Sequence, residues 1–161
     1  MSLTIRRARP EEAGLVLALV RELADYEKLL HEVEATEADI ADALFGANPR
    51  LFCEIAEWSG EVAGFAVWFV NYSTFAGRHG LYLEDLFVRP ALRGKGIGKA
   101  LLMHLATTCV TNGWSRLQWA VLDWNAPSIE FYKSLGADMM DEWTICRVTG
   151  TALTRLAGGS P

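Results

Sequence analysis

The segment Arg93-Gly94-Lys95-Gly96-Ile97-Gly98-Lys99 sets three alternating glycines among basic residues. It separates an apolar run that reads as a strand, Leu81 to Val88, from a helical pattern between about Gly98 and Asn112. Glycines allow backbone N–H groups to approach a ligand closely, and a helix N-terminus adds partial positive charge. The loop therefore predicts a site for a phosphate or pyrophosphate group.

Two better-known glycine motifs do not fit this segment. A dinucleotide-binding fingerprint needs a third glycine where Lys99 stands, and a P-loop needs Ser or Thr where Ala100 stands. A glycine-rich helix cap is the alternative, but three glycines exceed what a cap requires.

The remaining chain mixes strands and helices, with hairpins first and strand-to-helix units later. We predict strands over Leu3–Ala8, Leu51–Trp58, Glu61–Asn71, Leu81–Val88, Leu117–Leu122 and Trp143–Val148, and helices over Pro10–Tyr26, Thr36–Leu44, Gly98–Asn112 and Ala126–Leu135. This order predicts an α/β (α+β) sandwich, with a mixed, mostly antiparallel central sheet flanked by helices. A length of 161 residues fits a single domain over 1–161.

Composition excludes several classes of function. The formal net charge is −5 without a basic run, which argues against nucleic acid as a partner, and no apolar run approaches the ~20 residues of a membrane span. Cys53, Cys109 and Cys146 are far apart, so we expect reduced core thiols in a cytoplasmic protein. The three histidines lack metal-ligand spacing, which predicts no structural metal.

Arg93-x-x-Gly96-x-Gly98 resembles the Gln/Arg-x-x-Gly-x-Gly/Ala signature of the GCN5-related N-acetyltransferases, the GNAT superfamily. Three further blocks resemble its diamine branch, the spermidine/spermine N-acetyltransferases and their thialysine-acetylating relatives: Glu22–Glu27, Tyr82–Val88 and Trp124–Lys133. The resemblance covers about Ile5 to Ala157 and is closer to the thialysine members.

This resemblance implies acetyl-CoA as co-substrate and assigns residues to it. The loop would hold the coenzyme pyrophosphate, through Arg93, Gly94, Lys95, Gly96, Ile97, Gly98 and Lys99. The preceding strand would splay from its neighbour and leave backbone amides of Leu86, Phe87 and Val88 for the acetyl carbonyl and pantetheine. Asn125 and Ser128 would add coenzyme contacts, although Asn125 also fits a plain helix cap.

The resemblance also assigns the chemistry. Tyr132, which shares a helix face with Ser128, is the expected acid near the thioester sulfur; without the resemblance it reads as core packing. Glu84 is the candidate base, acting directly or through water. Adjacent strand residues point to opposite faces, so Asp85 becomes a second candidate base only if the strand is bulged, as the resemblance implies.

Tyr26 and Glu27 match the amine-binding pair of the family, and Glu84 or Asp85 would complete an anionic end for a cationic substrate. Trp119 would wall the amine channel, with sheet packing as the alternative reading. The resemblance further implies a homodimer, with the strand Trp143–Val148 at its interface.

These assignments predict transfer of an acetyl group to a primary amine of a small cationic molecule: a diamine, a polyamine or a thialysine/lysine-like compound. The alternatives are a protein or peptide N-acetyltransferase and a non-catalytic acetyl-CoA-binding module. Polyamine-acetylating relatives tend to carry Asp where Ser73 stands, which favours a short lysine-like amine, although another acid such as Glu32 could substitute.

Overall fold

The computed structural model describes residues 1–160, which divide into two compact units, Met1–Leu122 and the residues from Asp123 onward. The first unit holds a five-stranded sheet in the order β1-β2-β3-β4-β5. Its strands are β1 (Leu3–Arg7), β2 (Phe52–Trp58), β3 (Glu61–Ser73), β4 (Arg78–Val88) and β5 (Leu117–Trp119). Neighbours are antiparallel from β1 to β4, and β5 runs parallel to β4. The predicted mixed, mostly antiparallel sheet is confirmed.

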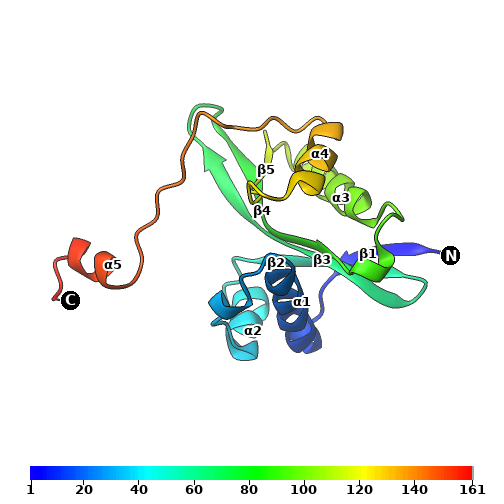
Figure 1. Ribbon diagram of the computed structural model, residues 1–161, viewed down its shortest axis with the longest axis horizontal. Helices are drawn as coiled ribbons and strands as arrows, with labels where there is room; N and C mark the ends of the chain where they lie inside the picture. Colours follow the sequence, from blue (N-terminus) through cyan, green and yellow to red (C-terminus); the bar gives the residue numbers. More distant parts are fainter. Residues whose placement is uncertain (161) are drawn as a thin grey trace. The chain divides into compact units, whose positions relative to one another are not determined.

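Three helices of the first unit cover both faces of this sheet. They are α1 (Ala13–Tyr26), α2 (Glu37–Phe45) and α3 (Ile97–Asn112). Figure 1 shows α1 and α2 on one side of the sheet and α3 on the other. Short 3-10 turns precede or follow them: η1 (Pro10–Glu12), η2 (Leu30–Glu32) and η3 (Pro90–Leu92).

Alternation along the strands divides the apolar side chains between the two faces. Cys53 and Ile55 of β2, with Phe65 and Val67 of β3, join the core cluster beneath α1 and α2. The other face packs on α3, whose buried residues are Ile97, Leu101, Leu102, Leu105 and Cys109. The helices are therefore held by burial of one apolar face each, as amphipathic patterns predict.

The start of α2 shows how local sequence sets an element boundary. Thr36 Oγ1 accepts a hydrogen bond from Asp39 N at 3.2 Å, and Asp39 Oδ2 accepts one from Thr36 N at 2.8 Å. This reciprocal pair satisfies two otherwise unpaired N–H groups of the first turn. The helix predicted to begin at Thr36 therefore starts at this cap, with Glu37 as its first helical residue.

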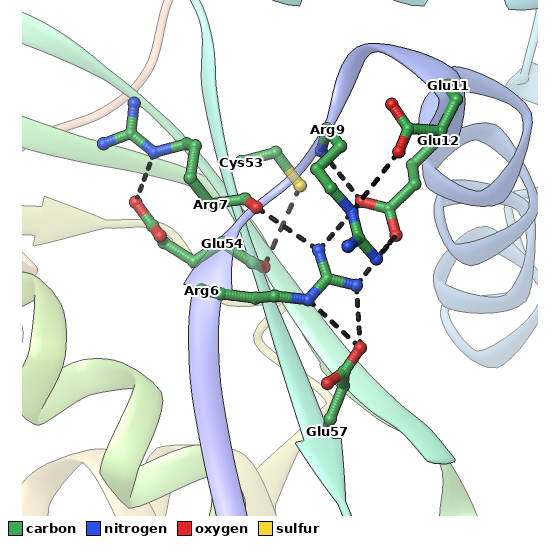
Figure 2. Close-up of polar contacts among 8 residues, drawn as sticks. All are labelled: Arg6, Arg7, Arg9, Glu11, Glu12, Cys53, Glu54 and Glu57. Atoms are coloured by element: carbon green, nitrogen blue, oxygen red, sulfur yellow. Dashed lines mark hydrogen bonds and ion pairs between the residues drawn. The ribbon is translucent and has the colours of Figure 1, made fainter. Parts of the chain in front are cut away.

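Arginine–glutamate contacts fasten the N-terminal strand to its surroundings. In Figure 2 the Arg6 guanidinium lies between Glu12 and Glu57, with Nη2 at 2.8 Å from Glu12 Oε1 and 2.7 Å from Glu57 Oε1. The Arg6 hydrogen bond, with smaller contributions from Arg9, lowers the pKa of Glu12 to about 2. Glu12 is therefore ionised at neutral pH and ties η1 to β1.

Glu54 is a buried carboxylate on the face of the sheet that packs on α3. Its side chain is 3% exposed, and its Oε1 lies 3.0 Å from Arg7 Nε (Figure 2). Trp68 Nε1 donates to the same oxygen at 3.3 Å, and His104 Nε2 of α3 lies 3.6 Å from Oε2. Burying a charge is tolerable only with such partners, so this cluster anchors β1 to the centre of the sheet.

We expect Arg7→Met to lower the free energy of unfolding by about 1–3 kcal/mol, because it leaves Glu54 buried without its strongest partner. Urea unfolding at pH 7 measures the loss. Glu54→Gln is the matched background, since it keeps an oxygen acceptor for Trp68 and removes the charge. In the Glu54→Gln protein, Arg7→Met should lower the free energy of unfolding clearly less than it does in the wild type. An equal loss in the two proteins would mean that Arg7 stabilises the fold through packing and not through its charge.

The second unit contains α4 (Ala126–Ser134) and α5 (Gly150–Leu156). The predicted strand over Trp143–Val148 is wrong, because this segment has no regular secondary structure and its large apolar side chains are exposed. Cys146 lies there and is exposed, so its assignment to the core is also wrong, whereas Cys53 and Cys109 are buried. A strand needs a partner strand to bond its backbone, and no neighbour within residues 1–160 pairs with this segment.

Candidate active site

The glycine loop adopts the backbone that its sequence predicts. Gly94 and Gly96 have φ of +77° and +78°, a left-handed conformation that side chains disfavour. Gly96 is the N-cap of α3, so the N–H groups of the first helical turn face the loop. A Cβ at either glycine would meet no atom within 4 Å, so the space beside the loop is open. These features fit a bound pyrophosphate.

Two of the loop's basic side chains lie against aromatic rings of neighbouring elements. The Arg93 guanidinium carbon is 4.6 Å from the centre of the Tyr26 ring at the end of α1. Lys95 Nζ is 5.6 Å from the Trp58 ring at the end of β2. Lys99 is exposed in the first turn of α3. The loop therefore carries positive charge and is fixed to two other elements.

The sheet opens directly before this loop. Strand β5 pairs with β4 only over Leu81–Leu83, so β4 continues through Glu84 to Val88 without β5 beside it. The Arg89 N–H donates to Ala63 O of β3 at 2.8 Å. By alternation Phe87 also bonds β3, whereas the N–H groups of Leu86 and Val88 point to the open side. The strand β5 thus leaves the second half of β4 uncovered, as the resemblance implies, and the coenzyme contacts predicted for Leu86, Phe87 and Val88 stay predictions.

A β-bulge lies at Glu84. The register with β3 passes from Val67↔Asp85 to Trp68↔Leu83, so Glu84 is the extra residue. A bulge breaks the alternation of side chains and re-aims them. Both Glu84 and Asp85 consequently line one pocket, which the sequence allowed only for a bulged strand.

This pocket, about 440 Å³ in volume, lies between the end of α1, the segment 29–35 and the bulge of β4. It is lined by Val20, Leu23, Ala24, Glu27, Leu29, Glu32, Val33, Glu34, Ala35, Glu84 and Asp85. Five of these side chains are carboxylic acids, and none of the described lining residues is Lys, Arg or His. Its size and charge suit a small cationic ligand.

Charge and burial perturb two of these acids. Burial, together with the negative charges of Glu84 and Glu27, raises the pKa of Asp85 from 3.8 to about 7. Burial also raises the pKa of Glu27. A carboxyl with a pKa near 7 can accept a proton at neutral pH, which is the property required of a general base.

Three residues with an assigned or suggested substrate role lie outside the pocket lining. Tyr26 packs instead on Phe87, with ring centres 6.5 Å apart, and under Arg93. Trp119 is the last residue of β5, opposite Leu83 where the sheet opens.

Ser73 is the third, at the far end of β3. Its Oγ accepts hydrogen bonds from Ala76 N and Arg116 Nη2, both at 3.1 Å. It lies six residues beyond Val67, the partner of Asp85, which is roughly 20 Å along a strand. Within one chain Ser73 therefore lies well away from Asp85 and from the pocket lining.

Asn125, Ser128 and Tyr132 belong to the second unit. Asn125 is buried, and its Oδ1 accepts a hydrogen bond from Ser128 N at 3.4 Å, so it caps α4 as its sequence position suggests. Ser128 and Tyr132 are one helical turn apart on α4, and the Tyr132 ring lies 5.6 Å from that of Phe131. Their proposed roles toward the coenzyme stay predictions.

The sequence analysis missed one acid of the pocket and one ion pair beside the loop. Glu34 lines the pocket close to Glu32, and the acidic pattern Glu32-x-Glu34 in the segment after α1 was a usable signal. Arg89, at the end of β4, forms a two-pronged ion pair with Glu22 of α1 at 2.8 and 3.0 Å. A pair 67 residues apart in sequence leaves no local signal.

Residues 1–160 contain neither a membrane-spanning helix nor a cluster of metal ligands. No helix in this range is long and apolar enough to cross a membrane. The same range contains no group of three or more His, Cys, Asp or Glu side chains placed to hold a metal ion.

Comparison with known proteins identifies the family. The sequence matches the acetyltransferase (GNAT) family over residues 16–137. Mouse thialysine N-epsilon-acetyltransferase is 39% identical over 98% of both chains, and an L-ornithine N5-acetyltransferase of Arabidopsis thaliana is 31% identical over 92% of this chain and 85% of its own. The solved structure of an integron cassette protein from the mobile metagenome of V. cholerae matches with a TM-score of 0.80, at 31% identity over 98% of both chains. With its splayed sheet and its glycine loop, the chain belongs to the GNAT family of acetyltransferases.

Proposed function

We propose that this protein transfers the acetyl group of acetyl-CoA to a primary amine of a small cationic molecule. The observation that carries the proposal is the five-carboxylate pocket at the bulge of β4, on the strand that leads into the glycine loop. The acidic lining attracts a cation, and the same strand continues to the outward amides of Leu86 and Val88. Substrate and acetyl donor would therefore meet along one strand.

The coenzyme side is supported by backbone groups. The N–H groups after Gly94 and Gly96 would hold the pyrophosphate, at about 1.5–3 kcal/mol for each charge-assisted hydrogen bond. The outward N–H groups of Leu86 and Val88 would bind pantetheine and the thioester carbonyl, whose oxygen gains negative charge during attack. Acetyl-CoA itself supplies the activated acyl group.

The amine side requires removal of a proton. An alkyl ammonium has a pKa near 10.4, so freeing its lone pair at pH 7 costs about 4.6 kcal/mol. We assign this step to the Glu84–Asp85 pair, in which the pKa of Asp85, raised to about 7, fits a base and the charge of Glu84 tunes it. The sequence analysis favoured Glu84 as the base; the burial and raised pKa of Asp85 support Asp85 as the member of the pair that takes the proton.

A lysine-like amino acid is the substrate class we favour. Similar chains are named for thialysine and L-ornithine, which are amino acids with a side-chain amine. Glu27, Glu32 and Glu34 provide carboxylates for the second ammonium group of such a molecule. The effect predicted for Ser73, which lies at the far end of β3 and outside the pocket lining, stays a prediction.

The test of this function is an amine panel that measures thiol release from acetyl-CoA. Thialysine, ornithine, spermidine and a lysine peptide with a blocked N-terminus are compared by kcat/KM. We expect thialysine or ornithine to be the best substrate. Acetylation of the peptide alone would favour a protein N-acetyltransferase, and acetyl-CoA binding without turnover of any amine would indicate a non-catalytic module.

We expect Tyr132→Phe to lower kcat about 10- to 100-fold, the value of one charge-assisted hydrogen bond to the leaving thiolate. The acetyl-CoA KM should change little, because the interaction forms only as charge develops on sulfur. Steady-state kinetics with a saturating amine measures both constants. Phe131→Leu is the matched control on α4, and equal losses in the two variants would indicate a packing role for Tyr132.

We further propose that the protein forms a homodimer in the cytoplasm, as one N-acetyltransferase domain. The exposed side chains of Trp143, Ile145 and Val148 support a second copy as the partner that covers this segment. None of the three cysteines forms a disulfide, which supports a reducing compartment. Analytical ultracentrifugation determines the oligomeric state.

A further inference from the structure

Tyr26 lies between the two halves of the candidate site. It is the last residue of α1, and the next residue, Glu27, lines the acidic pocket. Its ring, however, is turned toward the glycine loop, where the Arg93 guanidinium carbon lies 4.6 Å from the ring centre. The residue that sequence similarity assigns to the amine therefore contacts the coenzyme loop.

Arg93 is held by more than this ring. Its Nε donates to Val88 O at 2.8 Å, and its guanidinium lies 5.5 Å from the Phe87 ring. Tyr26 and Phe87 also contact each other, with ring planes tilted by 46°. The first residue of the glycine loop is thus fixed from three directions, by α1, by the ring of Phe87 and by the backbone of β4.

An ion pair between Glu22 and Arg89 lies one helical turn before Tyr26 on α1. Glu22 and Tyr26 are four residues apart, so they share one face of α1. Arg89, four residues before Arg93, pairs with Glu22 at 2.8 and 3.0 Å and donates to Val62 O at 2.9 Å. Two arginines therefore fasten the connection between β4 and α3 to the last two turns of α1.

We propose that Tyr26 is a positioning residue for acetyl-CoA, which acts by holding Arg93 and hence the start of the glycine loop. The proposal rests on the coenzyme role of that loop. Arg93 is exposed, and the cation–π contact with the Tyr26 ring restricts its motion. The backbone N–H groups that follow it therefore lose less conformational entropy when pyrophosphate binds. The aromatic ring, and not the phenol hydroxyl, performs this task.

The experiment compares Tyr26→Leu with Tyr26→Phe, by calorimetric titration with CoA in the absence of amine. Tyr26→Leu removes the ring and should weaken CoA binding about two- to fivefold, the range for an exposed cation–π contact. Tyr26→Phe keeps the ring and should bind CoA as the wild type does. Glu27→Gln, on the amine side, should leave CoA affinity unchanged.

A double-mutant cycle separates positioning from a general loss of structure. If Tyr26 acts through Arg93, Tyr26→Leu should have no further effect on CoA affinity in an Arg93→Met background. Additive losses would overturn the proposal, as would wild-type CoA affinity in Tyr26→Leu. A raised amine KM in Tyr26→Phe with unchanged CoA affinity would return Tyr26 to the amine site. Absence of CoA binding by the wild type would overturn the proposed function and this inference together.

Discussion

Asp85→Asn is expected to lower kcat/KM for the amine by about 10²- to 10⁴-fold, the usual contribution of a general base. In the wild type, kcat/KM should rise with pH through an apparent pKa near 7, because the raised pKa of Asp85 keeps the carboxyl protonated below that value. The variant should lack this rise, which is the acidic limb of the pH–rate profile. Initial rates between pH 5 and 9, at saturating acetyl-CoA, measure both effects.

Glu84→Gln is the informative companion to this variant. The charge of Glu84 contributes to the raised pKa of Asp85, so its removal should move the limb to lower pH while part of the activity remains. If Glu84 itself takes the proton, the result reverses: Glu84→Gln abolishes the limb and Asp85→Asn retains it. The two profiles together identify the member of the pair that titrates.

Stability provides an independent check on the same shift. Because the pKa of Asp85 is higher in the folded state than in the unfolded chain, the folded state binds more protons between about pH 4 and 7, and the free energy of unfolding falls as pH rises through that range. A shift of about three pKa units corresponds to at most about 4 kcal/mol. Asp85→Asn should therefore be more stable than the wild type at pH 8 and equally stable at pH 4, as measured by urea unfolding.

The elements that the sequence predicted correctly are those whose signal is local. The glycine loop could be recognised because Gly94 and Gly96 occupy backbone positions that disfavour any side chain, and α2 because Thr36 and Asp39 form its capping box. The five strands of the sheet followed from apolar runs bounded by turns. In each case the residues whose pattern led to the prediction are the same residues that form the structural feature.

The features that local patterns did not predict correctly depend on pairing over long distances. The bulge at Glu84 is a property of register between β3 and β4, so it was expected from the resemblance and not from any pattern in β4 alone. The segment 143–148 has the composition of a strand, but a strand forms only where another offers its backbone. Glu54 carried a weaker signal, as a charged residue within the apolar run of β2, which indicates either a bulge or a buried ion pair.

Gly96→Val is expected to lower acetyl-CoA affinity by at least about 100-fold, because it disturbs the N–H groups that would hold the pyrophosphate, each worth about 1.5–3 kcal/mol. Gly96 has φ +78°, where a β-branched residue is strained by about 1–2 kcal/mol. The surrounding space is open, so the fold should persist with that loss of stability. Calorimetry with CoA and thermal unfolding measure the two effects separately.

The chain contains a matched control at the other end of the same helix. Gly113, the C-cap of α3, has φ +69°, and a Cβ there would likewise meet no atom within 4 Å, but it lies at the opposite end of α3 from the loop. Gly113→Val should therefore cost similar stability and leave CoA binding unchanged. Asn tolerates the left-handed backbone conformation better than Val does. Gly96→Asn therefore tests whether a side chain at this position blocks CoA, with less backbone strain than Gly96→Val. If Gly96→Val and Gly113→Val bind CoA equally well, the glycine loop does not hold the coenzyme, and its glycines serve only to begin the helix.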